Sequence, residues 1–414
     1  MNSPGESMRT RIVRFCIFAT LLSGCAEASS EWAGTVETME NGARLVRNPE
    51  TGLWSQDEGE PWVLEEELRI GREDGEGGDV FGAIGSIHVD AAGRIYIVET
   101  QAREVRVFAP DGMMLRVLGG EGEGPGEFRI LSGVFRDGSG ATWVTDPGNA
   151  RYTRFDSLGT LLETRPRESR AMGGGPFLGG LTEDGVLYDT DLDVPAESAD
   201  LPPLMLAAGM GGTRLILRAM LAVDGRAVSD TIELPAATVD PVTFRTQGMM
   251  MGSPFNARLH TLFDPSGSVW WGESDEYRVY RRTLDGDTLM VIERAHTPVP
   301  VTADEIGEWL ASDAAKRFRE RGGELDPSQL QDVKPAFDGL FLDDAGFLWV
   351  RRITAEPDVR FDVFDPEGRF LGAVTGPSEM VRQAPVIRGD RLYAVVRGEY
   401  DVPYVVRYRI RGRG

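Results

Sequence analysis

The stretch IHVDAAGRIYIV, residues 87–98, contains the pattern that decides the fold: an apolar strand, an Asp-x-x-Gly turn, and a second strand with a fixed aromatic residue. The pattern occurs six times, with a shortened turn in the third copy and a degraded sixth copy. The copies cover residues 87–98, 134–145, 181–190, 261–272, 340–351 and 386–396. The aromatic residue three positions after the turn is Tyr96, Trp143, Tyr188, Trp270, Trp349 and Tyr393. Because only 8% of the chain is aromatic, this agreement indicates a true internal repeat.

Each repeat has room for four short antiparallel strands. A second turn, aromatic-x-x-x-Gly, is clear at residues 105–112, 152–159 and 361–368, and a fourth apolar segment follows it. Most repeats are 44 to 47 residues apart, and two intervals of 82 and 79 residues contain inserted loops. Such units are typical of propeller blades. The sequence therefore predicts an all-β, six-bladed β-propeller with four-stranded antiparallel blades.

The sixth repeat supplies only three strands before the chain ends. A matching fourth strand is available near the other end, at residues 62–70 (WVLEEELRI). We expect this N-terminal strand to pair with the last blade, because ring closure removes the sheet edges that an open array would expose.

Two blades resemble a known repeat family. Residues 118–128 (LGGEGEGPGEF), leading into residues 133–146, are similar to the NHL repeat, and so are residues 84–108. The chain also resembles the broad class of six-bladed propeller lipoproteins of environmental bacteria. The resemblance implies architecture more than function, since propellers include both binding proteins and enzymes.

The N-terminal residues predict export. Three arginines precede the apolar stretch FCIFATLL at residues 15–22, which is too short to span a bilayer. The following Leu22-Ser23-Gly24-Cys25 resembles the lipobox of bacterial lipoproteins, which implies a lipid on the Cys25 sulfur and a cell-envelope location. In an organism with two membranes, the residue after the cysteine favours the outer membrane. The expected domains are a signal peptide at 1–24, a flexible tether at 25–60 and the propeller at 61–411.

The composition limits the partners. The chain has 414 residues and a formal charge of -22, which argues against nucleic acid as a ligand. Cys25 is the single cysteine left after cleavage, so no internal disulfide is expected. We expect a monomer held at the membrane by its lipid, with a protein or glycan as its partner.

Three insertions, at 192–212, 237–258 and 295–337, fall in loops that share one face of a propeller. Long loops on one face of a rigid repeat usually carry the function. The last insertion predicts one helix, with a capping box from Thr302 to Glu305 and a stop at Gly322-Gly323. This helix is either a cap on the blades or a partner-binding element. The run Met249-Met250-Met251 is either an adaptable binding surface or the core of its own loop.

One position of the repeat, at the end of the second strand, carries mostly acidic residues that could bind a ligand; we call it the acidic column. The residues that end the second strands include Glu99, Asp146, Asp191, Glu273 and Arg352. These residues are candidates for a cation or polar-ligand site at the mouth of the ring. The alternative is structural, with each acid pairing with backbone or with arginine. No cofactor is expected, unless these acids hold a divalent cation.

The case for an enzyme is weak in the sequence. His88, His260 and His296 occupy non-equivalent positions of the repeat, and no nucleophile elbow, phosphate-binding loop or Cys-x-x-Cys pair occurs. The leading hypothesis is a binding or assembly scaffold that uses the loop-rich face. The alternatives are a metal-assisted lyase or hydrolase, similar to propeller lactonases, and a purely structural or sensor-like envelope module.

Overall fold

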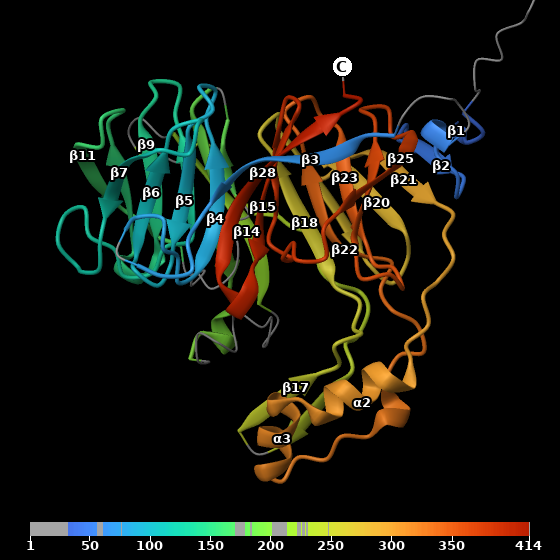
Figure 1. Cartoon of the computed structure of the whole chain (residues 1–414). Helices are drawn as coiled ribbons and strands as arrows, with labels where there is room; N and C mark the ends of the chain where they lie inside the picture. The colour runs from blue at the N-terminus through green and yellow to red at the C-terminus, as the bar shows by residue number, and fades with distance from the viewer. Residues whose placement is uncertain are drawn as a thin grey trace, which may run out of the picture.

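Six blades, each with four antiparallel strands, form a six-bladed β-propeller, and two further strands extend the sheet of blade four (Figure 1). The computed structural model describes residues 32–55, 61–75, 77–169, 179–182, 184–200, 213–221, 225, 228, 231–246 and 248–413. The predicted signal peptide and Cys25 lie outside the described residues. The six predicted repeats correspond to the six blades, which confirms the predicted fold class.

The blades have the following strands. Blade one contains β4 (Ile84–Val89), β5 (Ile95–Glu99), β6 (Glu104–Phe108) and β7 (Met114–Gly119); blade two contains β8 (Gly133–Arg136), β9 (Thr142–Asp146), β10 (Arg151–Phe155) and β11 (Leu161–Pro166). Blade three contains β12 (Gly180–Leu181), β13 (Val186–Asp193), β14 (Arg214–Leu221) and β15 (Ile232–Glu233); blade four contains β18 (Leu259–Asp264), β19 (Ser268–Glu273), β20 (Arg278–Thr283) and β21 (Thr288–Arg294). Blade five contains β22 (Phe337–Leu342), β23 (Leu348–Arg352), β24 (Val359–Phe364) and β25 (Phe370–Gly376); blade six contains β26 (Val386–Arg388), β27 (Arg391–Arg397), β28 (Pro403–Arg411) and β3 (Val63–Ile70).

The strand near the N-terminus closes the ring as predicted. β3 pairs antiparallel with β28, from Val63 opposite Arg411 to Ile70 opposite Val405. The last blade is therefore built from both ends of the chain, and β28 has a pairing partner on each side.

The hydrophobic core is divided among the interfaces between blades. Among the described residues, six clusters of buried side chains each lie between two neighbouring blades, and a seventh lies outside the ring. The fixed aromatic residues belong to this core, since Trp143 and Trp349 are fully buried. The ring is therefore held together by packing between sheets.

The repeated aspartate and aromatic residue are joined by a hydrogen bond. In blade five, Asp343 Oδ1 accepts the backbone N–H groups of Ala345 and Phe347, both at 2.9 Å, which fixes the turn. Asp343 Oδ2 accepts the indole N–H of Trp349 at 3.1 Å. Blade two repeats this arrangement with Trp143 Nε1 at 2.9 Å from the turn aspartate. The repeat thus satisfies the polar atom of an aromatic side chain that the core buries.

Replacing Asp343 with Ala is expected to lower the free energy of unfolding by about 3 kcal/mol, because the indole N–H of Trp349 loses its acceptor inside the core and Arg413 loses its buried ion-pair partner. Asp264→Ala in blade four is the matched control, because the Trp270 indole N–H has no hydrogen-bond partner in the described structure. We expect about 1 kcal/mol there, from the loss of the bonds to the Ser266 N–H and the Ser268 hydroxyl and of the long Arg281 ion pair, none of which involves the indole. Urea denaturation measures both, and equal losses would contradict the explanation.

The predicted tether is corrected by the structure over residues 32–55. β1 (Thr35–Thr38) and β2 (Arg44–Asn48) form a hairpin, and β2 pairs in parallel with β21, so that blade four has six strands. The Asn48 amide also joins blade five, where Asn48 Oδ1 accepts the Phe370 N–H at 2.7 Å. Leu45 and Val46 are buried in this hairpin. The segment folds because blade four offers an unpaired edge.

Candidate functional site on the insertion face

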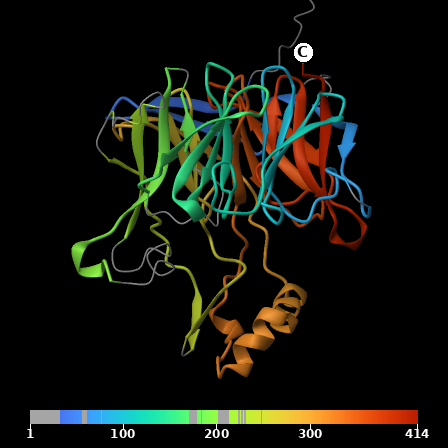
Figure 2. The same ribbon diagram turned by 90° about the vertical axis from the view of Figure 1, so that its left-hand side faces the viewer.

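The three insertions leave the ring on the same side, which we call the insertion face (Figures 1 and 2). Residues 201–212 of the first insertion lie outside the described residues. The described part of this insertion contains the short 3-10 helix η3 (Ala196–Ser198). The second insertion contains β16 (Thr243–Thr246) and β17 (Met249–Gly252), and the third contains α2 (Ala303–Ala311) and α3 (Asp313–Glu320). The predicted sidedness of the insertions is therefore observed in the described chain.

The helical insertion differs from the single helix predicted. The capping box is present, since Thr302 Oγ1 accepts the Glu305 N–H at 3.3 Å and Glu305 Oε2 accepts the Thr302 N–H at 3.0 Å. The helix is interrupted at Ser312, whose backbone is extended and whose hydroxyl caps the second helix through the Ala315 N–H at 3.2 Å. None of the helices in the described residues is long and apolar enough to span a membrane.

The second and third insertions form one lobe with a core of its own. This lobe comprises residues 243–252 and 302–331. Its core joins Phe244 and Met251 of the hairpin with Ala315 and Phe318 of α3 and with Leu330. The methionine run is split between the two expected roles, because Met251 is buried in this core while Met250 is 49% exposed. The helices therefore pack on the hairpin of the second insertion rather than on the blades.

Two extended stems hold the lobe away from the ring (Figure 2). The first stem is closed by the Ser253 N–H, which donates to the Val242 carbonyl at 2.9 Å. The second stem pairs residues 299–301 with residues 332–334, through bonds of 2.8 and 2.9 Å. Gln331 Nε2 donates to Asn256 Oδ1 at 2.6 Å and joins the two stems. The lobe is therefore a separately packed unit carried by hydrogen-bonded stems.

Three of the predicted acidic residues face the backbone that enters their own blade. Glu99 Oε1 accepts the N–H groups of Gly82 and Ala83 at 3.1 and 2.7 Å. Asp146 accepts the N–H groups of residues 129 and 130 at 3.0 to 3.3 Å. Glu273 accepts those of residues 238 and 239 at 2.8 to 3.1 Å. These carboxylates therefore fix the connections between blades, which is the structural alternative weighed from the sequence.

The remaining two column residues make ion pairs. Asp191 binds the guanidinium of Arg218 in the next strand, and Arg352 Nε lies 3.5 Å from Asp362 Oδ1. In the described part of the chain, no group of three or more His, Cys, Asp or Glu side chains could hold a metal ion. The column is therefore not brought together as a cation site there, and the metal-assisted hypothesis has no ligand set among these residues.

A buried charge cluster joins blades four and five beneath the third insertion. Tyr277 donates its hydroxyl to Asp362 Oδ2 at 2.7 Å, and Arg294 Nη1 lies 3.5 Å from the same oxygen. All three side chains are at most 6% exposed. Burial and then the Asp362 carboxylate raise the pKa of Tyr277 well above its ordinary value. Blades two and three have an equivalent cluster of Tyr152, Arg167 and Asp189.

A pocket of about 260 Å³ lies at the root of the helical stem, above the buried cluster. Its lining includes Asp275, Arg278, Arg294, His296 and Lys334. Burial, followed by repulsion from neighbouring glutamates, raises the pKa of Asp275, and burial lowers the pKa of His296. The pocket therefore offers hydrogen-bonding groups of both charge signs beside a neutral imidazole, as suits a small polar ligand or a polar part of a partner.

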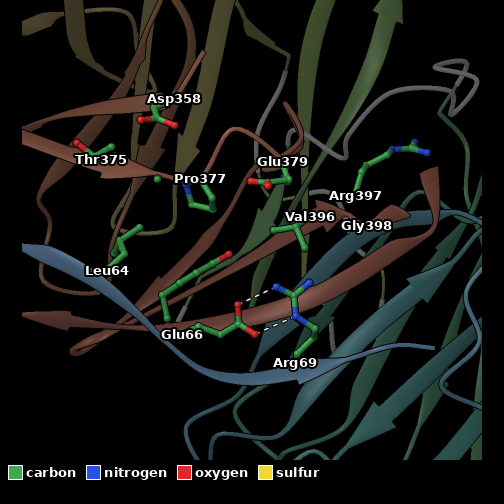
Figure 3. Close-up of a pocket in the computed structure, with 12 residues that line it drawn as sticks. Leu64, Glu66, Arg69, Asp358, Thr375, Pro377, Glu379, Val396, Arg397 and Gly398 are labelled. Carbon is green, nitrogen blue, oxygen red and sulfur yellow. Dashed lines mark hydrogen bonds and ion pairs between the residues drawn. The ribbon is translucent and has the colours of Figure 1, made fainter. Parts of the chain in front are cut away.

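A larger pocket, of about 550 Å³, lies between blades five and six (Figure 3). Its charged groups are largely paired, since Arg69 donates to both oxygens of Glu66 at 2.9 and 2.7 Å. Burial and Glu66 raise the pKa of Tyr408 to about 12. Both arginines that line this pocket are already paired, Arg69 with Glu66 and Arg397 with Asp401, so its cationic donors are less available to a ligand.

An exposed tyrosine on the insertion face was not recognised in the sequence. Tyr400 lies in η6 (Glu399–Asp401), between the second and third strands of blade six, and is 81% exposed. Its φ of 58° and that of Asp401, 63°, are in the left-handed region that side chains rarely adopt. An ion pair of 2.6 Å between Arg397 and Asp401 holds the loop. Strained backbone of this kind is concentrated at functional sites.

Comparisons with known proteins identify no family. No protein-family model matches the chain, and no curated protein matches it in sequence. Among solved structures, a Bacteroides fragilis protein described as exported is 13% identical, with a TM-score of 0.46, and the match covers 89% of this chain and 99% of that one. Virginiamycin B lyase from Staphylococcus aureus is also 13% identical, with a TM-score of 0.42, over 84% and 99% of the two chains. No residue role is transferred from either protein.

Proposed function

We propose that this protein is a lipid-anchored scaffold of the cell envelope that binds a protein or glycan partner through the insertion face. The lobe is the observation that carries the proposal. Two insertions from different places in the chain build a separately packed unit that is not needed to complete any blade. A rigid ring that presents one such unit is suited to recognition.

The exposed side chains on this side favour a protein partner. Met250 on the lobe and Val333 on its stem are each 49% exposed, and Tyr400 is 81% exposed. Methionine and tyrosine are enriched in protein interfaces, where they supply large contact areas. A glycan partner would instead rely on the polar pocket at the root of the stem, so the site of contact distinguishes the two.

Replacing the lobe is expected to abolish partner binding and leave the ring folded. The hydrogen-bonded stems allow residues 243–252 and residues 302–331 each to be replaced by Asn-Gly, a turn that suits antiparallel strands. Because the lobe core is separate from the six blade interfaces, we expect an unfolding temperature close to that of the intact chain. Calorimetry checks the fold, and capture of the partner from envelope extracts checks binding.

A photo-crosslinking amino acid at Met250 provides a second measurement in living cells. Met113, which is 62% exposed in the third-to-fourth turn of blade one, is the matched control on the opposite face. We expect an adduct from position 250 and none from position 113. Equal adducts from both positions, or capture that survives replacement of the lobe, would overturn the proposal.

A further inference from the structure

Five side chains from blades four and five and from the connection to blade six lie near one another where the innermost strands reach the insertion face. His260 lies on β18 and Asp338 on β22, the innermost strands of blades four and five. Arg258 precedes β18, Arg351 is near the end of β23, and Arg382 lies in the connection to blade six. We call these residues the axial cluster. The proposed function does not use them, and they lie outside the lobe.

The ion pairs of the axial cluster leave part of its positive charge uncompensated. Asp338 Oδ2 lies 3.0 Å from Arg382 Nε, and Asp338 Oδ1 lies 3.4 Å from Arg351 Nε. Arg351 is used structurally, because it also donates to the carbonyls of residues 381 and 380 at 2.5 and 3.1 Å. Arg258 is exposed, and its guanidinium has no hydrogen bond or contact ion pair within the described chain. Three guanidinium groups against one carboxylate leave a surplus of two positive charges.

These groups share one electrostatic environment. Burial raises the pKa of Asp338, opposed by Arg351, Arg382 and Arg258. Burial, together with Arg258 and Arg382, lowers the pKa of His260 to about 4. At neutral pH the imidazole is therefore an uncharged hydrogen-bonding group beside two exposed guanidinium groups. In a chain of formal charge -22, such a local surplus attracts anions selectively.

We propose that the axial cluster binds an oxyanion, with Arg258 and Arg382 as its direct ligands and His260 as a neutral hydrogen-bonding partner. Guanidinium groups match the geometry of carboxylate and phosphate oxygens, which they bind through paired hydrogen bonds. Asp338 pairs with Arg382 and so competes with a bound anion for this guanidinium. The site is independent of the lobe, so its test and that of the partner role can fail separately.

The test is a calorimetric titration of the full-length chain at low salt. D-glucuronate and inorganic phosphate are the probes, and D-glucose is the uncharged comparison. We expect saturable binding of one anion per chain and none of glucose. Binding of glucuronate identifies a carboxylate ligand and binding of phosphate a phosphorylated one. Failure of both probes to bind would overturn the proposal.

Single substitutions in the axial cluster test whether its positive charge strengthens anion binding. Arg258→Gln is expected to weaken anion binding about tenfold, because a charge-assisted hydrogen bond is lost. This substitution breaks no contact ion pair of the described structure, so the fold is retained. Asp338→Asn is expected to tighten binding, since it removes the competing negative charge. Arg245→Gln, at an exposed arginine on the lobe hairpin, is the matched control and should change nothing. Unaltered affinity in Arg258→Gln, or weaker binding in Asp338→Asn, would contradict the assignment.

Discussion

A chain that begins at residue 72 is expected not to form a stable ring, whereas a chain that begins at residue 61 is expected to fold. The two differ by β3, which pairs with β28 along the outer edge of blade six. Ile70 is buried between blades six and one, and Leu64 and Leu68 pack at the interfaces on either side of blade six. Losing these contacts and a full strand of hydrogen bonds costs more than about 5 kcal/mol, which is comparable with the stability of an ordinary domain.

The shorter truncation is the control, because it removes β1 and β2 but leaves blade four with its own four strands. Circular dichroism and calorimetry measure the outcome. A synthetic peptide of residues 61–72, added in trans, should restore cooperative unfolding to the chain that begins at residue 72. Equal stability of the two truncated chains would show that ring closure does not depend on β3.

Asp362→Ala is expected to lower the free energy of unfolding by about 3–5 kcal/mol. The substitution removes the fully buried carboxylate that faces Tyr277, Arg294 and Arg352. Two guanidinium groups would then face each other between blades four and five without a counterion. Breaking a buried ion pair by removing one partner is strongly destabilising, because the remaining charge is not solvated.

Tyr277→Phe is the matched variant at the same place, since it removes one hydrogen bond and keeps the ring. We expect a loss of about 1 kcal/mol. Asp189→Ala, in the equivalent cluster between blades two and three, should behave like Asp362→Ala. Urea denaturation compares the three proteins. A loss for Asp362→Ala no greater than that for Tyr277→Phe would show that the charges between the blades are solvated.

The blades could be predicted because the signal for each is local. The turn aspartate and the aromatic residue are six positions apart, as in Asp343 and Trp349, and hydrogen-bond each other directly. This interaction recurs in different blades, so an internal comparison of the sequence reveals it. Ring closure followed from counting strands, since one blade lacked a fourth strand.

The hairpin at the N-terminus could not be predicted in the same way. β2 pairs with β21, some 246 residues further along the chain, and its five residues contain no repeated pattern. Glu99, Asp146 and Glu273 end their second strands as the repeat predicts, whereas β13 continues two residues past Asp191. The partners of these three carboxylates are backbone N–H groups, which no side-chain pattern reveals. Three members of the axial cluster, Arg258, Asp338 and Arg382, lie outside the six copies of the repeat, so only the closed ring brings them together.

The docked hairpin determines how far the ring can stand from a bilayer. Six residues lie between Cys25 and Trp32, and the seven steps along an extended chain, at about 3.5 Å each, reach at most about 25 Å in all. β1 and β2 lie at the outer rim of blade four, near the side away from the lobe (Figures 1 and 2). If Cys25 is acylated, we expect the short segment between Cys25 and Trp32 to keep the ring close to the lipid headgroups. The lobe would then point away from the membrane, into the aqueous space.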